Sequence, residues 1–251
     1  MLHAVDVGNS NTVIGTFVDG ELTEHYRLTT AATRTADEWL LLLKQLGLGD
    51  FSGAAEAIIA SVVPSATAAI EQAFSRLAMS VIVVGPGVKT GVPILAENPK
   101  EVGADRVVNA AAAFDRYPGG LIVVDFGTAT TFDCVSPRGE YLGGAIAPGL
   151  AISAEALYQR AAKLPRVGVE RPRQVIGRNT VDSMKSGLFF GYVGLVDGLV
   201  ERMKGELDFA VRVVATGGLA ARVADVSASI EQVDEHLTLH GLHLIYRRNQ
   251  P

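Results

Sequence analysis

Two short segments of the sequence combine an aspartate, a glycine and hydroxyl-bearing side chains at the end of an apolar run. The first is Asp6-Val-Gly-Asn-Ser-Asn-Thr-Val13 and the second is Asp125-Phe-Gly-Thr-Ala-Thr-Thr131. A glycine lets the backbone turn sharply, flanking amides and hydroxyls donate to phosphate oxygens, and a carboxylate can hold a cation. Together the segments favour a phosphate and cation site, although the first alone also fits an ordinary hairpin turn and the second alone also fits a Thr-rich β-strand.

The two segments belong to a longer internal repeat. At an offset of 119 residues, positions 2–21 align with 121–140 without a gap, and seven of the twenty pairs are identical. Several identities fall at turn residues, so chance similarity between two buried hairpins is the weaker explanation. We expect two hairpins, each reading strand, Asp-x-Gly bend, strand and Gly-Glu turn. The identical pairs are Leu2 and Leu121, Val5 and Val124, Asp6 and Asp125, Gly8 and Gly127, Thr12 and Thr131, Gly20 and Gly139, and Glu21 and Glu140.

A third polar segment, residues 98–106, leads into a helical stretch and contains Asp105 and Arg106. Phosphoryl transfer to a hydroxyl needs a base near that hydroxyl, and an anionic acceptor favours an arginine. Asp105 could equally cap the helix, and Arg106 could be a surface charge. The residues alone leave both interpretations open.

Two glycine-rich segments precede predicted helices. We interpret Gly143–Gly149 as a rigid loop of small residues that opens a helix. Thr216–Ala220 follows an apolar strand, and its Gly-Gly bend would let a flat base or a ribose approach the backbone. A turn at a helix start explains either segment equally well.

Apolar runs alternate with stretches of helical spacing along the chain, which predicts an α/β protein. We divide it near the turn-rich sequence Tyr117-Pro-Gly-Gly, into 1–117 and 118–251. The expected strands are 2–7, 12–18, 57–63, 81–84, 121–125, 131–135 and 211–215, and the expected helices are 36–46, 66–77, 104–114, 151–164, 181–207 and a short one after Gly217.

Composition excludes several classes of function. The net charge is −5 with no Lys/Arg cluster, so we expect no nucleic-acid partner. Cys134 is the only cysteine, and neither a signal peptide nor an apolar run of membrane length is present, so we expect a cytoplasmic protein without membrane contact. Helical spacing relates three histidines, His236, His240 and His243, but no acidic or cysteine cluster accompanies them and Gly241 weakens a helix there. We therefore interpret them as exposed or core histidines and not as a zinc site.

Five motifs in order carry a family resemblance: Asp6-Val-Gly-Asn, Gly103-Ala-Asp-Arg106, Asp125-Phe-Gly-Thr-Ala-Thr130, Gly143–Gly149 and Gly177-Arg-Asn-Thr180. Across nearly its whole length the chain resembles type III pantothenate kinase. The resemblance implies a duplicated actin-like (ribonuclease H-like) fold with two similar halves around an ATP cleft. It also implies a homodimer, with dimer helices and an adenosine region in the second half. The implied reaction transfers the γ-phosphate of ATP to pantothenate, giving 4'-phosphopantothenate, the first step of coenzyme A biosynthesis.

The resemblance also implies roles for individual residues. Asp105 would be the proton acceptor, and Asp125 would bind the monovalent cation, K+ or NH4+, while Mg2+ would accompany ATP. Contacts to pantothenate would come from Gly103, Ala104, Asp105, Arg106 and Thr180, with Thr180 acting across the dimer interface. Contacts to ATP would come from Asp6, Val7, Gly8, Asn9, Ser10, Asn11, Thr12, Val13 and Thr128.

One position departs from the family pattern. Many members carry a tyrosine seven residues before the Gly of Gly-Ala-Asp-Arg, where this chain has Ala96. One pantothenate contact of the family is therefore lost here or supplied by another residue. The alternatives are another small-molecule kinase on the same fold and an accessory regulatory protein of the Bvg type, although intact Asp6, Asp105 and Asp125 argue against an inactive relative.

Overall fold

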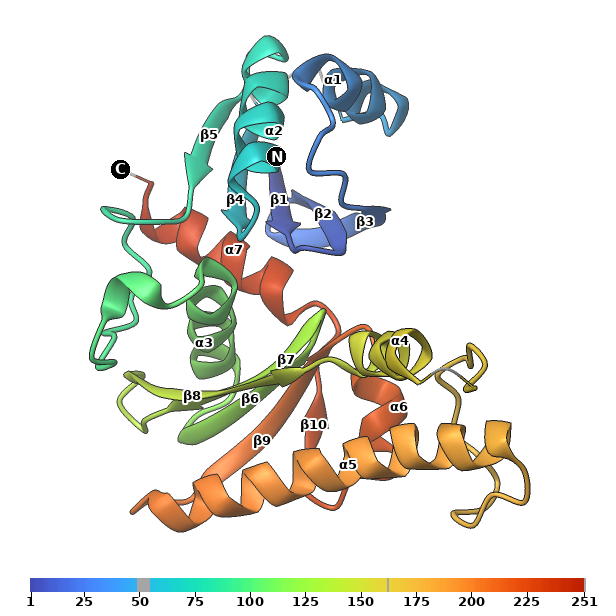
Figure 1. Ribbon diagram of the computed structural model, residues 1–251. Coiled ribbons are helices and arrows are strands. Elements are labelled where there is room, and N and C mark those ends of the chain that lie inside the picture. The colour runs from blue at the N-terminus through green and yellow to red at the C-terminus, as the bar shows by residue number, and fades with distance from the viewer. Residues whose placement is uncertain (49–54, 162, 251) are drawn as a thin grey trace. The chain divides into compact units, whose positions relative to one another are not determined.

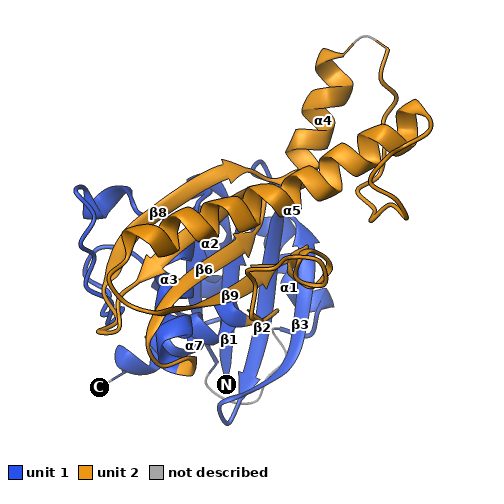
Figure 2. Ribbon diagram, turned by 90° about the horizontal axis from the view of Figure 1, so that it is seen from below, with its two compact units in different colours: residues 1–115, 237–251 blue, residues 116–236 orange. Residues whose placement is uncertain are grey.

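The computed structural model describes residues 1–48, 55–161 and 163–250 and divides into two compact units (Figure 2). Unit 1 contains residues 1–115 and 237–251, and unit 2 contains residues 116–236. The boundary in mid-chain lies beside the division expected after residue 117. The expected second half also included 237–251, but the helix that begins at Leu237 packs on the first sheet and therefore groups with unit 1.

Unit 1 is built on a five-stranded sheet in the order β3-β2-β1-β4-β5. β1 pairs antiparallel with β2 and parallel with β4. Helices α1 and α2 cover one face of this sheet and α7 covers the other (Figure 1). The elements are β1 (Leu2–Val7), β2 (Asn11–Val18), β3 (Glu21–Thr29), α1 (Ala36–Gln45), β4 (Glu56–Ser61), α2 (Pro64–Arg76), β5 (Ser80–Val83) and α7 (Leu237–Arg248).

Alternation along β1 separates core residues from a candidate functional residue. Val5 and Val7 are buried in the core that Trp39 and Phe74 of α1 and α2 help to form. Asp6 lies on the opposite face of the strand, because successive side chains of a strand point to opposite faces. The pleat therefore places the Asp6 carboxylate away from the α1 and α2 core.

A 3-10 turn (Pro99–Glu101) precedes helix α3 (Ala104–Arg116), which approaches α7 very closely. A Cβ added at Gly241 of α7 would lie 2.4 Å from the carbonyl oxygen of Val108. Gly241 is thus a contact point rather than a weak point of the helix. The histidines of α7 also have partners, since His243 stacks on Phe17 with ring centroids 4.6 Å apart.

Unit 2 repeats this plan with a sheet in the order β10-β9-β6-β7-β8. The long helix α5 covers one face of the sheet, with Phe189 and Val196 against Ile122, Val124 and Phe132 (Figure 2). The elements are β6 (Gly120–Phe126), β7 (Ala129–Val135), β8 (Tyr141–Pro148), α4 (Leu150–Arg160), α5 (Thr180–Glu206), β9 (Val211–Gly217), α6 (Ala220–Ala224) and β10 (Gln232–Val233).

The predicted duplication is confirmed by the topology of the two sheets. In each unit two antiparallel hairpins are followed by strands that join the sheet in parallel. The gapless alignment is nevertheless one residue out of register after the bend. Val7 pairs with Thr12, whereas its counterpart Phe126 pairs with Thr130, so Thr12 corresponds to Thr130 and not to Thr131.

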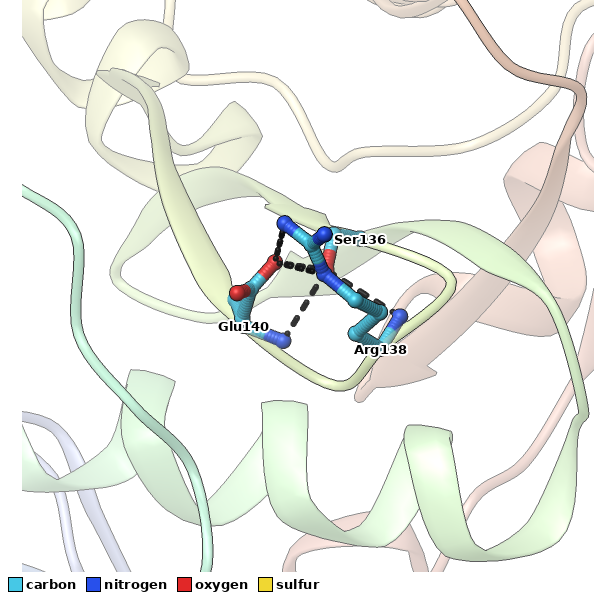
Figure 3. A network of polar contacts seen from close by, with 3 residues as sticks. All are labelled: Ser136, Arg138 and Glu140. Atoms are coloured by element: carbon cyan, nitrogen blue, oxygen red, sulfur yellow. Dashed lines mark hydrogen bonds and ion pairs between the residues drawn. The ribbon is translucent and has the colours of Figure 1, made fainter.

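The register returns at the second turn, where the second copy is longer. Val18 pairs directly with Glu21, whereas Ser136 and Glu140 are joined through a three-residue turn that contains Gly139 at φ 81°. The Ser136 hydroxyl donates to a carboxylate oxygen of Glu140 at 2.7 Å, and Arg138 donates to the same oxygen (Figure 3). These donors lower the pKa of the Glu140 carboxyl and fix the turn.

One predicted loop is a strand. Residues 143–148 of the glycine-rich segment belong to β8, and only Gly149 forms the start of a helix, as the N-cap of α4. β8 lies at the edge of its sheet, where glycines are tolerated and one side of the strand needs no partner. The predicted helix 151–164 ends at Arg160, and residue 162 of that range lies outside the described residues.

None of the helices that the structure describes is both long enough and apolar enough to cross a membrane.

Candidate active site

The first Asp-x-Gly bend forms a tight loop between β1 and β2. The amide N–H of Gly8 donates to the carbonyl of Asn11 at 3.0 Å, and a Cβ at Gly8 would lie 3.2 Å from that oxygen. Asn9, Ser10 and Asn11 are exposed at the tip, while Asp6 is half-buried at the end of β1. The loop therefore presents polar backbone and side chains next to a carboxylate, as the sequence predicts.

Val7 and Thr12 of the same segment face the core. Both are fully buried and lie opposite each other in the β1–β2 pair. The Thr12 hydroxyl contacts the hydroxyl of Thr30 at 2.9 Å. Thr12 is therefore placed to support the loop from behind, on the face of the sheet opposite Asp6.

The second bend places Asp125 beside a glycine of the neighbouring strand. Asp125 of β6 pairs with Thr216 of β9, and Gly217 follows with φ +91°. A Cβ at Gly217 would lie 2.6 Å from Oδ1 of Asp125. Glycine at this position leaves the space that the Asp125 carboxylate occupies.

A hydroxyl chain lies across the β6–β7 pair from Asp125. Thr131 is its direct partner on β7, and the Thr131 hydroxyl donates to Oδ2 of Asp133 at 3.1 Å. Tyr141 donates to Oδ1 of the same buried carboxylate at 2.9 Å. Since the only hydroxyl hydrogen of Thr131 is directed to Asp133, its oxygen can act only as an acceptor or cation ligand elsewhere.

Thr128 lies in the second bend, which packs directly against Gly149. The N–H of Gly149 donates to the carbonyl of Thr128 at 3.1 Å, and the N–H of Gly127 donates to the carbonyl of Ala129 at 3.0 Å. Behind the bend, the buried Thr130 hydroxyl bonds the hydroxyl of Tyr192 on α5. Thr130 thus supports the second bend as Thr12 supports the first.

Asp105 lies in the first turn of α3, with its carboxylate folded back over the helix start. The N–H of Arg106 donates to Oδ1 of Asp105 at 2.9 Å. A Cβ at Gly103 would lie 2.4 Å from that oxygen, so glycine there allows the conformation. Burial raises the pKa of Asp105 above its usual range, against the opposing effects of the Arg106 amide and charge. Geometry is thus compatible with a cap and with a base, and the raised pKa suits a base.

Thr180 is the first residue of α5 and is exposed. The preceding Asn179 caps the helix, because its side chain accepts from the N–H of Asp182 at 2.9 Å. A Cβ at Gly177 would lie 2.3 Å from the backbone nitrogen of Ser183, so this motif packs tightly onto the helix start. The arrangement fixes where the Thr180 side chain leaves the backbone.

Comparison with known proteins decides the family. Residues 2–202 match the family described as type III pantothenate kinase. A curated relative of that name from Anaeromyxobacter sp. (strain Fw109-5) is 58% identical, with 100% of both chains covered. The chain belongs to the type III pantothenate kinase family. The sequence motifs thus led to the right family.

Solved structures confirm the fold of this pantothenate kinase family member. A protein from Campylobacter jejuni ascribed to the Baf family of transcriptional activators has a TM-score of 0.62 and 20% identity, with 98% of each chain covered. An inorganic polyphosphate/ATP-glucomannokinase from Arthrobacter sp. strain KM has a TM-score of 0.53 and 14% identity, with 99% of each chain covered. The likeness to a sugar kinase, together with the two related sheets, shows the duplicated actin-like fold.

Sequence reasoning missed Thr30 and the positional importance of Gly149 and Gly217. Thr30 follows β3, and its role depends on a third strand returning to the bend. The offset of 119 residues relates Thr30 to Gly149, but the two residues differ, so the repeat shows no identity that would mark Thr30.

Proposed function

We propose that this protein transfers the γ-phosphate of ATP to the primary hydroxyl of pantothenate, giving 4'-phosphopantothenate, the first step of coenzyme A biosynthesis. The observation that carries this proposal is full-length similarity to type III pantothenate kinases, at 58% identity for the relative from Anaeromyxobacter. The chain keeps Asp6, Asp105 and Asp125 in structural settings suited to phosphate, base and cation chemistry.

In this proposal the segment Asp6 to Val13 binds the ATP phosphates. Backbone N–H groups in a tight bend are well suited to anionic oxygens. The exposed tip, Asn9 to Asn11, supplies the direct contacts, and Val7 and Thr12 act by holding the loop from the core side. Thr128 contributes the corresponding contact from the second bend.

Asp105 is proposed as the base. It accepts the proton of the pantothenate hydroxyl as the hydroxyl oxygen attacks the γ-phosphorus and ADP leaves. Burial favours this role, because the raised pKa of Asp105 makes the carboxylate a stronger proton acceptor. Gly103, Ala104 and Arg106 are proposed to contact pantothenate beside it, with the guanidinium near the pantothenate carboxylate.

Asp125 is proposed to hold the monovalent cation, K+ or NH4+. The residues fit such an ion, because Asp125 supplies a carboxylate and Thr131, directly opposite, has its hydroxyl hydrogen directed to Asp133. When bound, the cation would supply positive charge to offset the negative charge of the phosphates. Mg2+ is proposed to enter with ATP, bound mainly through phosphate oxygens and water.

We also propose a homodimer, to which Thr180 contributes from across the interface. Exposed apolar side chains gather in unit 2 on α4 and in the segment before α5, including Ile152, Tyr158, Val175 and Ile176, the last 82% exposed. Such a concentration of apolar surface is typical of an interface. A cytoplasmic location is proposed as well, since the only cysteine, Cys134, is free and buried.

Replacing Ile176 by Asp should convert the dimer to monomers, because a carboxylate would be buried without a partner. Light scattering after size-exclusion chromatography measures this. Leu41→Asp is the matched control, since Leu41 is 65% exposed on α1 in unit 1 and should leave the dimer intact. A wild-type protein that is monomeric at every concentration would contradict the dimer proposal.

The acceptor is tested by incubating the protein with ATP and a set of hydroxyl compounds, followed by mass spectrometry of the products. We expect phosphate on pantothenate and none on sugars or glycerol. Phosphorylation of a sugar instead would indicate another kinase on this fold. No phosphorylated product with any acceptor would favour an accessory regulatory protein.

A further inference from the structure

Thr30, the residue directly after β3, holds the first bend through three contacts. Its hydroxyl donates to the carbonyl of Gly8 at 2.8 Å, and its N–H donates to the carbonyl of Ser10 at 3.0 Å. The third contact joins its hydroxyl to that of Thr12 at 2.9 Å. Residues on both sides of the exposed tip are thus fixed by a single side chain and its backbone amide.

The direction of the hydroxyl bonds follows from counting hydrogens. A threonine hydroxyl has one hydrogen, and the Gly8 carbonyl can only accept. The Thr30 hydrogen therefore goes to Gly8, and Thr12 must be the donor in the contact between the two hydroxyls. Thr12 acts on the bend through Thr30 and has no hydrogen left for a ligand.

The second half carries the same device at the equivalent position. Gly149 is offset from Thr30 by 119 residues, directly follows β8, and donates its N–H to the carbonyl of Thr128 in the second bend at 3.1 Å. A Cβ at Gly149 would lie 2.2 Å from that carbonyl oxygen and 2.7 Å from the carbonyl oxygen of Gly127. The second bend is therefore held by a backbone N–H at a position that has no room for a side chain.

We propose that Thr30 and Gly149 are positioning residues that fix the two phosphate-binding bends in the conformation that ATP requires. This inference rests on the proposed function, because it assigns the bends to ATP. Both residues act through the backbone of other residues. A bend already held in its binding conformation loses less conformational entropy when a ligand binds, so the effect falls on nucleotide affinity.

Thr30→Val removes both hydroxyl contacts and keeps the shape and β-branching of the side chain. We expect the KM for ATP and the Kd for a non-hydrolysable ATP analogue to rise roughly tenfold or more, with the KM for pantothenate unchanged. Thr30→Ser keeps the hydroxyl and should restore most of the affinity. Isothermal titration with the analogue and steady-state kinetics provide the two measurements.

Thr23→Val is the matched control. The Thr23 hydroxyl also donates from β3 to a β2 carbonyl, that of Thr16 at 3.1 Å, but it lies far along the hairpin from the bend. Loss of the Thr23 hydroxyl should leave nucleotide affinity unchanged.

Gly149→Ala is a second test of the proposal. It should weaken analogue binding, because the new Cβ would displace the second bend.

The outcomes separate the inference from the proposed function. Analogue affinity that is unchanged in Thr30→Val, with only a lower melting temperature, would overturn the positioning role even in an active kinase. A wild-type protein that binds the analogue but does not phosphorylate pantothenate would overturn the proposal that pantothenate is the acceptor. The analogue affinities of Thr30→Val and the wild type would still test the positioning role, because they need no acceptor.

Discussion

Replacement of Asp105 by Asn should lower kcat by roughly 10²–10⁴-fold, the usual contribution of a positioned general base, while ATP binding stays close to that of the wild type. The substitution keeps the shape of the side chain, and the amide oxygen can still accept from the N–H of Arg106. Asparagine caps a helix start about as well as aspartate. The variant therefore removes the proposed base without removing the cap.

The pH dependence of kcat/KM of the wild type is a second test of the proposed role of Asp105. A base must be deprotonated, so kcat/KM should fall as pH decreases through the pKa of Asp105. Because burial raises that pKa, the acid limb should lie above the range of an ordinary aspartate. In Asp105→Asn the residual activity should lose this limb.

Asp37→Asn is the control for Asp105→Asn. Asp37 occupies the corresponding position of α1, the second helical residue, and pairs on the surface with Arg76. Its replacement should leave kcat unchanged within about twofold, because exposed ion pairs contribute little. If Asp105→Asn were as active as Asp37→Asn, Asp105 would be a helix cap and the base would have to be sought elsewhere.

Replacement of Gly217 by Ala should have the second largest effect, by displacing the Asp125 carboxylate. The new Cβ would lie 2.6 Å from Oδ1 of Asp125 and 2.7 Å from the backbone nitrogen and oxygen of Phe126. Displacement of a catalytic group by an ångström can cost about 10²-fold in rate. We expect turnover to fall by that order and the K+ concentration for half-maximal activity to rise.

The strain of the backbone itself has to be separated from this contact. Gly217 has φ +91°, where a residue with a Cβ costs about 1–2 kcal/mol. Gly143→Ala is the matched control, because Gly143 has φ +121° on β8 and its Cβ would meet nothing within 4 Å. Both variants should lose thermal stability, but only Gly217→Ala should change the K+ response. An equal K+ response in the two variants would contradict a role of Gly217 at the proposed cation site.

Much of the fold was predictable because its elements carry local signals. Val- and Ile-rich runs predict the strands β1, β4, β6 and β9, and the identities between residues 2–21 and 121–140 predict two hairpins. The repeat also placed Asp6 and Asp125 at matching strand ends, which the structure confirms.

Two features lay beyond sequence reasoning for physical reasons. The bend is one residue shorter in the second copy and the following turn one residue longer, so the changes cancel and a gapless alignment wrongly matches Thr12 with Thr131. β8 was read as a loop because a sheet edge accepts glycines that a central strand would not.

The support from Thr30 was hidden for a different reason. Its hydrogen bonds span 18 and 22 residues and exist only once β3 has returned to the bend. No local pattern marks such a residue. Its counterpart is Gly149, so even the repeat shows no identity at this position. The backbone N–H of each residue nevertheless donates to a carbonyl oxygen of the bend in its own unit.

The central claim is tested most directly by the rate of ADP release from the wild-type protein with ATP and pantothenate, in K+ and in Na+. We predict turnover that requires pantothenate and falls sharply when Na+ replaces K+. No turnover with pantothenate, together with turnover on another alcohol, would contradict the claim.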